Sequence, residues 1–161
     1  MNPISRDRFL SAPVTLGDGV VRTVRDFEED PSPPYSEERI RNRLIYYYRY
    51  VLTEEHEKVT SMLDLVGGCR TPGIRVLLYA TPINVGAADR RLGEAFRSTV
   101  SRNVGLLGDL LDRRGVLFLD LSFALDEDGF NRKESGYPNE HLVERGWRLI
   151  ADRLASVLQA P

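Results

Sequence analysis

Hydrophobic residues recur with helical spacing between residues 37 and 66 of the chain. At about 100° per residue they fall within one broad stripe, typical of an amphipathic helix: Ile40, Leu44, Tyr47, Tyr48, Val51, Leu52, Val59, Met62, Leu63 and Val66. Ser36 is a suitable N-cap, and Glu37 and Glu38 suit the first turn of a helix. The pattern predicts one long helix over 37–66, or two helices with a break near Thr53. In either case we expect Gly67-Gly68 to end the helical region.

Two nearly continuous hydrophobic runs follow, and each is typical of a buried strand. The first covers residues 74–80, after the turn signal Thr71-Pro72-Gly73, and the second covers residues 116–122. Between them one helical face carries Leu92, Phe96, Val100, Val104, Leu107 and Leu111, and Gly115 is suited to end that helix. The order strand, helix, strand predicts a right-handed βαβ unit with parallel strands.

The two ends of the chain give weaker patterns. Residues 1–35 predict an irregular arm, with a possible hairpin at 16–24 and an acidic, proline-rich linker at 26–35. Residues 126–140 predict a polar loop. The last helix is expected to follow this loop, with one hydrophobic side formed by Trp147, Ile150, Leu154, Val157 and Leu158. We therefore divide the chain into an arm, 1–35, and an α/β part, 36–161.

The composition of the chain narrows the classes of protein to which it could belong. A chain of 161 residues with 42% hydrophobic and 29% charged residues suits one globular domain. The formal net charge is -2 and no basic block occurs, which argues against nucleic acid and anionic membranes as partners. The N-terminus lacks a signal-peptide h-region, so a cytoplasmic location is expected. Cys69 is the sole cysteine, which excludes an intrachain disulfide.

Residues whose side chains could take part in catalysis or binding cluster where the predicted strands end. Parallel α/β sheets form their sites beyond the carboxyl ends of the strands. Thr81 and Asn84 follow the first strand, Asp120 ends the second, and His141 precedes the last helix. His141 suits general base chemistry near neutral pH. Asp120 could orient that histidine or accept hydrogen bonds from loop amides.

The other histidine, His56, predicts no site. It lies at the edge of the hydrophobic stripe, beside Glu54, Glu55 and Glu57. These acids would point to different sides of a helix, so a solvated helix face is expected rather than a metal site. Neither predicted strand is followed by a glycine-rich phosphate loop. No cofactor and no metal is predicted.

Residues 74–158 resemble the C-terminal half of the SGNH (GDSL-type) hydrolases and acyltransferases. The resemblance depends on several short motifs in order: Thr81-Pro82-Ile83-Asn84, Phe96-Arg97, Arg102-Asn103, Phe118-Leu119-Asp120-Leu121-Ser122, and His141 with Gly146. It implies a partial three-layer α/β/α fold (flavodoxin-like) with a short parallel sheet and an N-terminal helical extension. It also implies that His141 is the catalytic base, with Asp120 in support and with Thr81, Asn84 and Glu140 near the substrate.

The chain departs from this family at two positions. The family's acid lies three residues before the histidine, where this chain has Pro138; Asp120, Asp126 or Asp128 could replace it. The family's Gly-Asp-Ser nucleophile is missing, and its nearest echo is Gly17-Asp18-Gly19.

Three hypotheses follow from these departures. The first is an SGNH-like esterase or acyltransferase component that a serine-bearing partner chain completes. The second is a non-catalytic SGNH-derived module that binds a partner or forms a homo-oligomer. The third is a complete small α/β enzyme of other chemistry that uses Asn84, Asp120 and His141.

Overall fold

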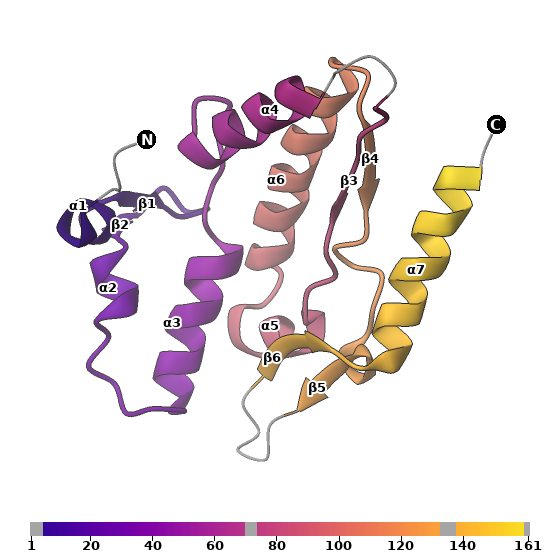
Figure 1. Cartoon of the computed structure of the whole chain (residues 1–161). Coiled ribbons are helices and arrows are strands. Elements are labelled where there is room, and N and C mark those ends of the chain that lie inside the picture. Colours follow the sequence, from indigo (N-terminus) through magenta and orange to yellow (C-terminus); the bar gives the residue numbers. More distant parts are fainter. Residues whose placement is uncertain (1–4, 70–73, 133–137, 160–161) are drawn as a thin grey trace.

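The computed structural model describes residues 5–69, 74–132 and 138–159 and has a mixed α/β architecture (Figure 1). The predicted turn at 71–73 and the part of the predicted loop at 133–137 lie outside the described residues. In Figure 1 the N-terminal elements lie on one side, α6 runs through the middle, and the β3–β4 pair lies between α6 and α7. The elements in chain order are α1 (Arg6–Leu10), β1 (Pro13–Thr15), β2 (Val21–Thr23), α2 (Arg25–Glu28), α3 (Glu37–Tyr48), α4 (Glu57–Cys69), β3 (Leu77–Ala80), α5 (Val85–Leu92), α6 (Ala95–Asp112), β4 (Leu117–Asp120), a 3-10 turn η1 (Glu127–Gly129), β5 (Phe130–Arg132), β6 (Pro138–Leu142) and α7 (Glu144–Gln159).

The stripe over 37–66 forms two helices, α3 and α4, rather than one. Ser36 caps α3 as predicted, since its Oγ accepts the Arg39 amide at 3.2 Å. The chain leaves the helix at residues 49–56, where Tyr50 makes a strand-like bridge to Leu16. The predicted stop at Gly67-Gly68 is wrong, because α4 continues through both glycines to Cys69. Packing of Val66, which is 2% exposed, outweighs the poor helix propensity of two glycines.

The N-terminal arm contains the expected hairpin and two unexpected helices. Strands β1 and β2 pair antiparallel, with Val14 opposite Arg22. Helices α1 and α2 have five and four residues, too few for a helical period to show in the sequence. Hydrophobic residues of the arm pack against Ile45 of α3 in one cluster: Leu10, Val14, Leu16, Val24 and Phe27. The arm is therefore joined to α3 by a shared core.

The proline-rich segment is fixed to α3 by a buried carboxylate. Asp30 is 7% exposed and accepts the Ser32 amide and the Asn42 side-chain amide, both at 2.8 Å. Arg39 donates to the Ser32 carbonyl at 3.0 Å. The hydrogen bond from Asn42, followed by those from Ser32, lowers the pKa of the Asp30 carboxyl to about 2.

Strands β3 and β4 are parallel, as predicted, but two helices, α5 and α6, connect them where the pattern predicted one. The break lies at Gly93, whose φ of 62° ends α5, so Leu92 lies in α5 and the other residues of the predicted helical face lie in α6. Leu77 pairs with Leu117 and Ala80 pairs with Asp120. One side of the pair packs with Val66, Leu111 and Val116. The prediction that both strands are buried is wrong, because Tyr79 is 36% exposed and Leu117 is 49% exposed. A sheet of two strands is too narrow for the helices of this chain to bury both of its faces.

The polar segment at 126–140 is more ordered than expected. It contains η1, β5 and most of β6, and β5 pairs antiparallel with β6. The prediction of a plain loop was wrong because these strands are short and lack a hydrophobic alternation. Helix α7 begins directly after β6, and Gly146 in its first turn is buried. No helix in the described parts of the chain is both long and apolar enough to cross a membrane.

We expect Asp30→Asn to destabilise the protein at neutral pH, because the charged acceptor of two hydrogen bonds is lost. The folded-state pKa of about 2 lies below the ordinary 3.8. The carboxylate therefore contributes stability above pH 3.8, and the protein loses that stability as the pH falls toward 2. Urea unfolding followed by circular dichroism should show a smaller loss of stability over this range in Asp30→Asn than in the wild type. Asp152→Asn, on exposed α7, should behave as the wild type.

Gly146→Ala should destabilise the fold through a clash with backbone. An added Cβ would lie 2.8 Å from the Gly129 carbonyl oxygen and 3.1 Å from Leu125 Cδ1. Overpacking of this kind costs about 1–3 kcal/mol, which exceeds the gain in helix propensity. Gly105→Ala in α6 is the matched control, because nothing lies within 4 Å of its added Cβ. Thermal unfolding should show a lower Tm for Gly146→Ala and an equal or higher Tm for Gly105→Ala.

Candidate functional site

A cavity of about 320 Å³ lies beyond the carboxyl end of β3, where β6 and the first turns of α7 approach it. It contains three of the five residues selected from the sequence, Thr81, Glu140 and His141. Its described lining is Tyr79, Thr81, Pro82, Glu140, His141, Leu142, Trp147 and Ile150. Residues distant in the sequence therefore meet at the position that the parallel topology predicts.

His141 lies on strand β6 and not in a loop as predicted. The β5–β6 ladder places Leu142 opposite Phe130, which is 3% exposed. The Val143 amide then donates to the Gly129 carbonyl at 3.1 Å, directly before α7 begins. The exposed His141 thus lies on backbone that is joined on one side to β5, through a register with one irregularity, and is followed on the other side by the close contact of Gly146.

Glu140 brings a carboxyl group to the same cavity. The residue as a whole is exposed, but neighbouring protein atoms desolvate the carboxyl and raise its pKa above the ordinary value of 4.5. A carboxyl with a raised pKa keeps its proton to a higher pH and can donate a hydrogen bond. The lining of the cavity therefore includes the carboxyl of Glu140, the imidazole of His141 and the hydroxyl of Thr81.

Asp120 and Asn84, the other two selected residues, do not line this cavity. The Asp120 carboxylate accepts the Ser122 amide at 2.8 Å, which is the loop role that the sequence left open. Asn84 is 4% exposed, and its Oδ1 accepts the Ala87 amide at 3.2 Å. Asn84 is thus the N-cap of α5, and both side chains shape the turns that follow β3 and β4.

Two aromatic residues at the cavity were not selected from the sequence. Tyr79, next to last in β3, is 36% exposed, and Trp147, in the first turn of α7, is 58% exposed. Exposed aromatic rings beside polar groups are typical of ligand and partner sites. Periodicity assigned Trp147 to the core.

A second cavity, of about 360 Å³, lies between α5, α6 and the segment after β4. Its charged groups are already paired within the protein. Arg97 donates to both oxygens of Asp89 and lies 5.5 Å from the ring centroid of Phe123. Arg90 donates to both oxygens of Glu127, at 2.7 and 2.6 Å. These bidentate pairs join α5 to neighbouring segments, which is a structural role.

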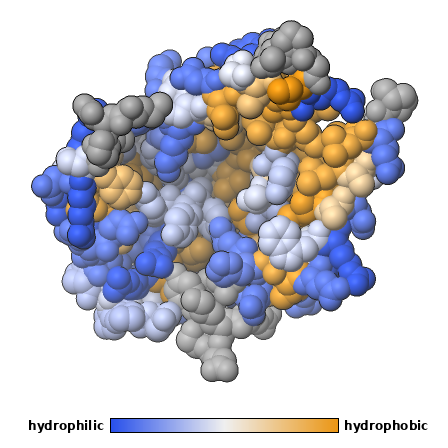
Figure 2. Space-filling model, viewed as in Figure 1, coloured by the Kyte–Doolittle hydropathy of each residue, from blue (hydrophilic) through white to orange (hydrophobic). Residues whose placement is uncertain are grey.

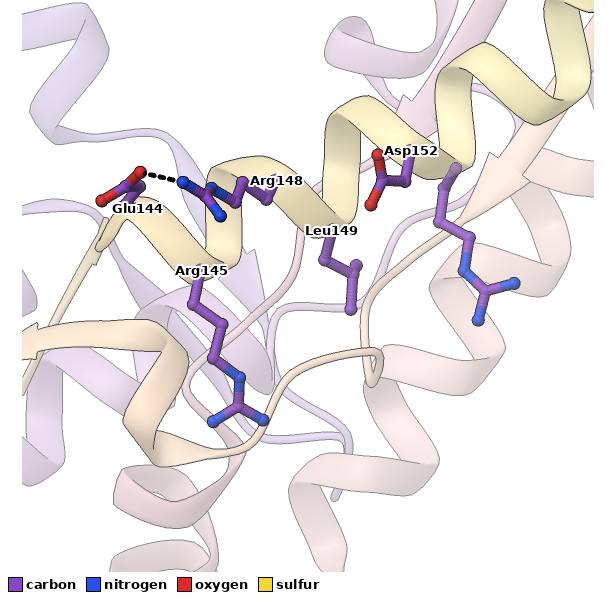
Figure 3. A pocket seen from close by; sticks show the side chains of 6 residues that line it. Glu144, Arg145, Arg148, Leu149 and Asp152 are labelled. Carbon is purple, nitrogen blue, oxygen red and sulfur yellow. Dashed lines mark hydrogen bonds and ion pairs between the residues drawn. The ribbon is translucent and has the colours of Figure 1, made fainter.

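A third hollow, of about 560 Å³, runs along α7 and is shown in Figure 3. All of its described lining residues come from that one helix, namely Glu144, Arg145, Arg148, Leu149, Asp152 and Arg153. Arg148 pairs with Glu144 at 2.6 Å, and Arg145 pairs with Asp126 at 3.1 Å. Among the described residues that line it, none comes from a second element, so this open groove is a weaker candidate than the His141 cavity.

His56 is not on a solvated helix face, which corrects the prediction. It is half-buried and contacts the Tyr50 hydroxyl through Nε2, while Nδ1 accepts the Lys58 amide at 3.1 Å. Helix α4 begins one residue later than His56, so the histidine is at the cap rather than on the surface. Among the described residues, no group of three or more His, Cys, Asp or Glu side chains could hold a metal ion.

Comparison with known proteins finds no match to this chain. No protein-family model matches the chain. No curated protein and no solved structure matches it significantly either.

Proposed function

We propose that this chain is a component of an SGNH-like ester hydrolase or acyltransferase, in which His141 is the general base and another chain supplies the nucleophile. The observation that supports this most directly is the cavity that Thr81, Glu140 and His141 share at the end of β3. A histidine in a cleft, on a strand fixed from both sides, is suited to accept a proton from a nucleophile.

The contents of the cavity favour a nucleophile from elsewhere. None of its described lining residues is a serine or a cysteine. Acyl transfer by a triad needs a nucleophile within hydrogen-bond reach of the base, and donors for the oxyanion. A serine-bearing chain that covers the cavity would supply both and would exclude water from the reacting groups.

The side of the molecule that carries β3, β4 and α7 supports a partner. Figure 2 shows a hydrophobic area there. Several large hydrophobic residues of this side are about half exposed, namely Ile74, Leu117, Trp147 and Leu158, and of these Trp147 lines the cavity. Exposed apolar surface of this kind is typical of protein interfaces.

The second candidate is a non-catalytic module that binds a partner or forms a homo-oligomer. The hydrogen bond from the Ser122 amide to the Asp120 carboxylate favours this second candidate, because the carboxylate caps a turn instead of facing the cavity. Sedimentation analysis separates the candidates in part. A stable dimer that is inert toward aryl esters, alone and with cell extract, supports the module.

His141→Asn should abolish any serine activation that depends on this chain. The purified chain is added to an extract of its source cells, and a fluorophosphonate probe then labels activated serines. We expect a labelled band that requires the chain and weakens by about 100-fold or more with His141→Asn, as general base loss predicts.

His56→Asn is the matched control, because it makes the same change at the other histidine, outside the cavity. An asparagine can still cap α4, so labelling should stay at the wild-type level at pH 7.5. Equal labelling with both variants, or no band that depends on the chain, would contradict the proposal.

A further inference from the structure

Two aromatic residues, Tyr79 and Trp147, line the cavity at the end of β3 and are 36% and 58% exposed. Other aromatic rings of this chain pair with its own cations, and Arg97, for example, lies over the rings of Phe96 and Phe123. Within the described parts of the chain, neither Tyr79 nor Trp147 contacts a cationic side chain or another ring in this way. Both rings are therefore available to a ligand.

Glu140 gives the cavity a negative group without a counter-charge. It is the one acid in the described lining, which contains no lysine and no arginine. Burial by neighbouring atoms raises the pKa of its carboxyl, and no cation of the protein lowers it again. A carboxylate that has lost water and gained no cation is stabilised by a ligand that brings a positive charge.

The other charged and titratable groups near the cavity do not oppose a cation. His141 lines it as well, and the neutral imidazole that a general base requires does not repel a positive charge. Arg145 and Arg148, in the first turns of α7, line the separate hollow of Figure 3. They are paired with Asp126 and Glu144. The lining of the cavity thus favours a cationic ligand over an anionic one.

The remaining lining indicates the kind of cation. Pro82, Leu142 and Ile150 add apolar surface to the two aromatic rings. A primary ammonium is strongly hydrated and needs three hydrogen-bond acceptors, which suits such walls poorly. A quaternary ammonium group donates no hydrogen bond and carries its charge on methyl groups that pack well against aromatic rings. The volume of about 320 Å³ lies at the lower end of the range of small-molecule sites, about 300–1,000 Å³.

We propose that this cavity binds a quaternary ammonium group, with Tyr79 and Trp147 against its methyl groups and the Glu140 carboxylate balancing its charge. The assignment of this group to the ester substrate rests on the proposed function, whereas its binding requires no nucleophile. In an ester of a choline-like alcohol, the bound cation would hold the ester beside His141, which lines the same cavity.

The fluorescence of Trp147 tests the proposal directly, because it is the only tryptophan of the chain and it lines the cavity. The full chain is titrated at neutral pH and constant ionic strength with choline. A second titration uses the uncharged carbon analogue of choline, in which a tert-butyl group replaces the trimethylammonium group. We expect a saturable change with choline and an affinity for the carbon analogue that is about tenfold lower or weaker still, because the attraction to the rings and to the carboxylate both need the charge.

Variants of the carboxyl and of one ring identify the groups that bind. Glu140→Gln should weaken choline binding by about tenfold and leave binding of the carbon analogue unchanged, because it removes only the charge. Glu144→Gln is the matched control, since Glu144 lies outside the described lining of this cavity and should not affect choline binding. Tyr79→Leu should weaken choline binding by about fivefold, whereas Tyr79→Phe keeps the ring and should bind as the wild type does.

Three results would overturn the inference: equal affinity for choline and its carbon analogue, no saturable change with millimolar choline, or equal choline binding by Glu140→Gln and Glu144→Gln. The proposed function fails separately, in the labelling of activated serines by the fluorophosphonate probe. A chain that binds choline as expected but activates no serine keeps this binding site and loses the catalytic role.

Discussion

The side-chain amide of Asn103 joins the connector between α3 and α4 (residues 49–56) to α6. This one group satisfies an amide and a carbonyl of the connector, at the middle of a helix that packs with α3, α5 and β4. Helix α6 places Phe96 in the core beneath α3 and Leu111 in the core beneath β4. Without the Asn103 contacts, two partly buried backbone groups would lose their partners. The N-terminal elements would then be joined to the rest by side-chain packing of α3 on α6 and by the ion pair between Glu37 and Arg91.

The His141 cavity is built differently, because firm backbone supports side chains that remain open to a ligand. Gly146 lets α7 approach the Gly129 carbonyl, and β5 fixes β6, so the frame of the cavity is well determined. Tyr79 and Trp147 are left exposed at its wall. A site of this construction gains by being covered, since closure would bury the aromatic rings and strengthen hydrogen bonds to Glu140 and His141. That is why we favour a site completed by a second surface.

Sequence periodicity predicted the parts of the fold whose hydrophobic pattern is long, such as α6, α7 and the parallel β3–β4 pair. It failed where structure depends on single contacts. The sequence left open whether 37–66 is one helix or two, and the segment at the break is bound by residues distant in the sequence, Asn103 on one side and Thr15 and Leu16 on the other. Strands β5 and β6 lack an alternating pattern, so His141 was expected in a loop. The positions of Thr81 and His141 at one end of the sheet followed from topology, whereas the hydrogen bond from the Ser122 amide to the Asp120 carboxylate could not be predicted from the sequence.

The three sheets of the described chain have two strands each, and this has a consequence for how the protein folds. The β1–β2 and β5–β6 pairs join neighbouring segments and can close within microseconds. The β3–β4 pair must instead wait until α5 and α6 bring Leu77 to Leu117, because the closing of that loop costs entropy before any contact repays it. We therefore expect the packing of α6 against β4 to be the slow step of folding. Substitutions there change the rate of folding, whereas those in the hairpins change mainly the rate of unfolding.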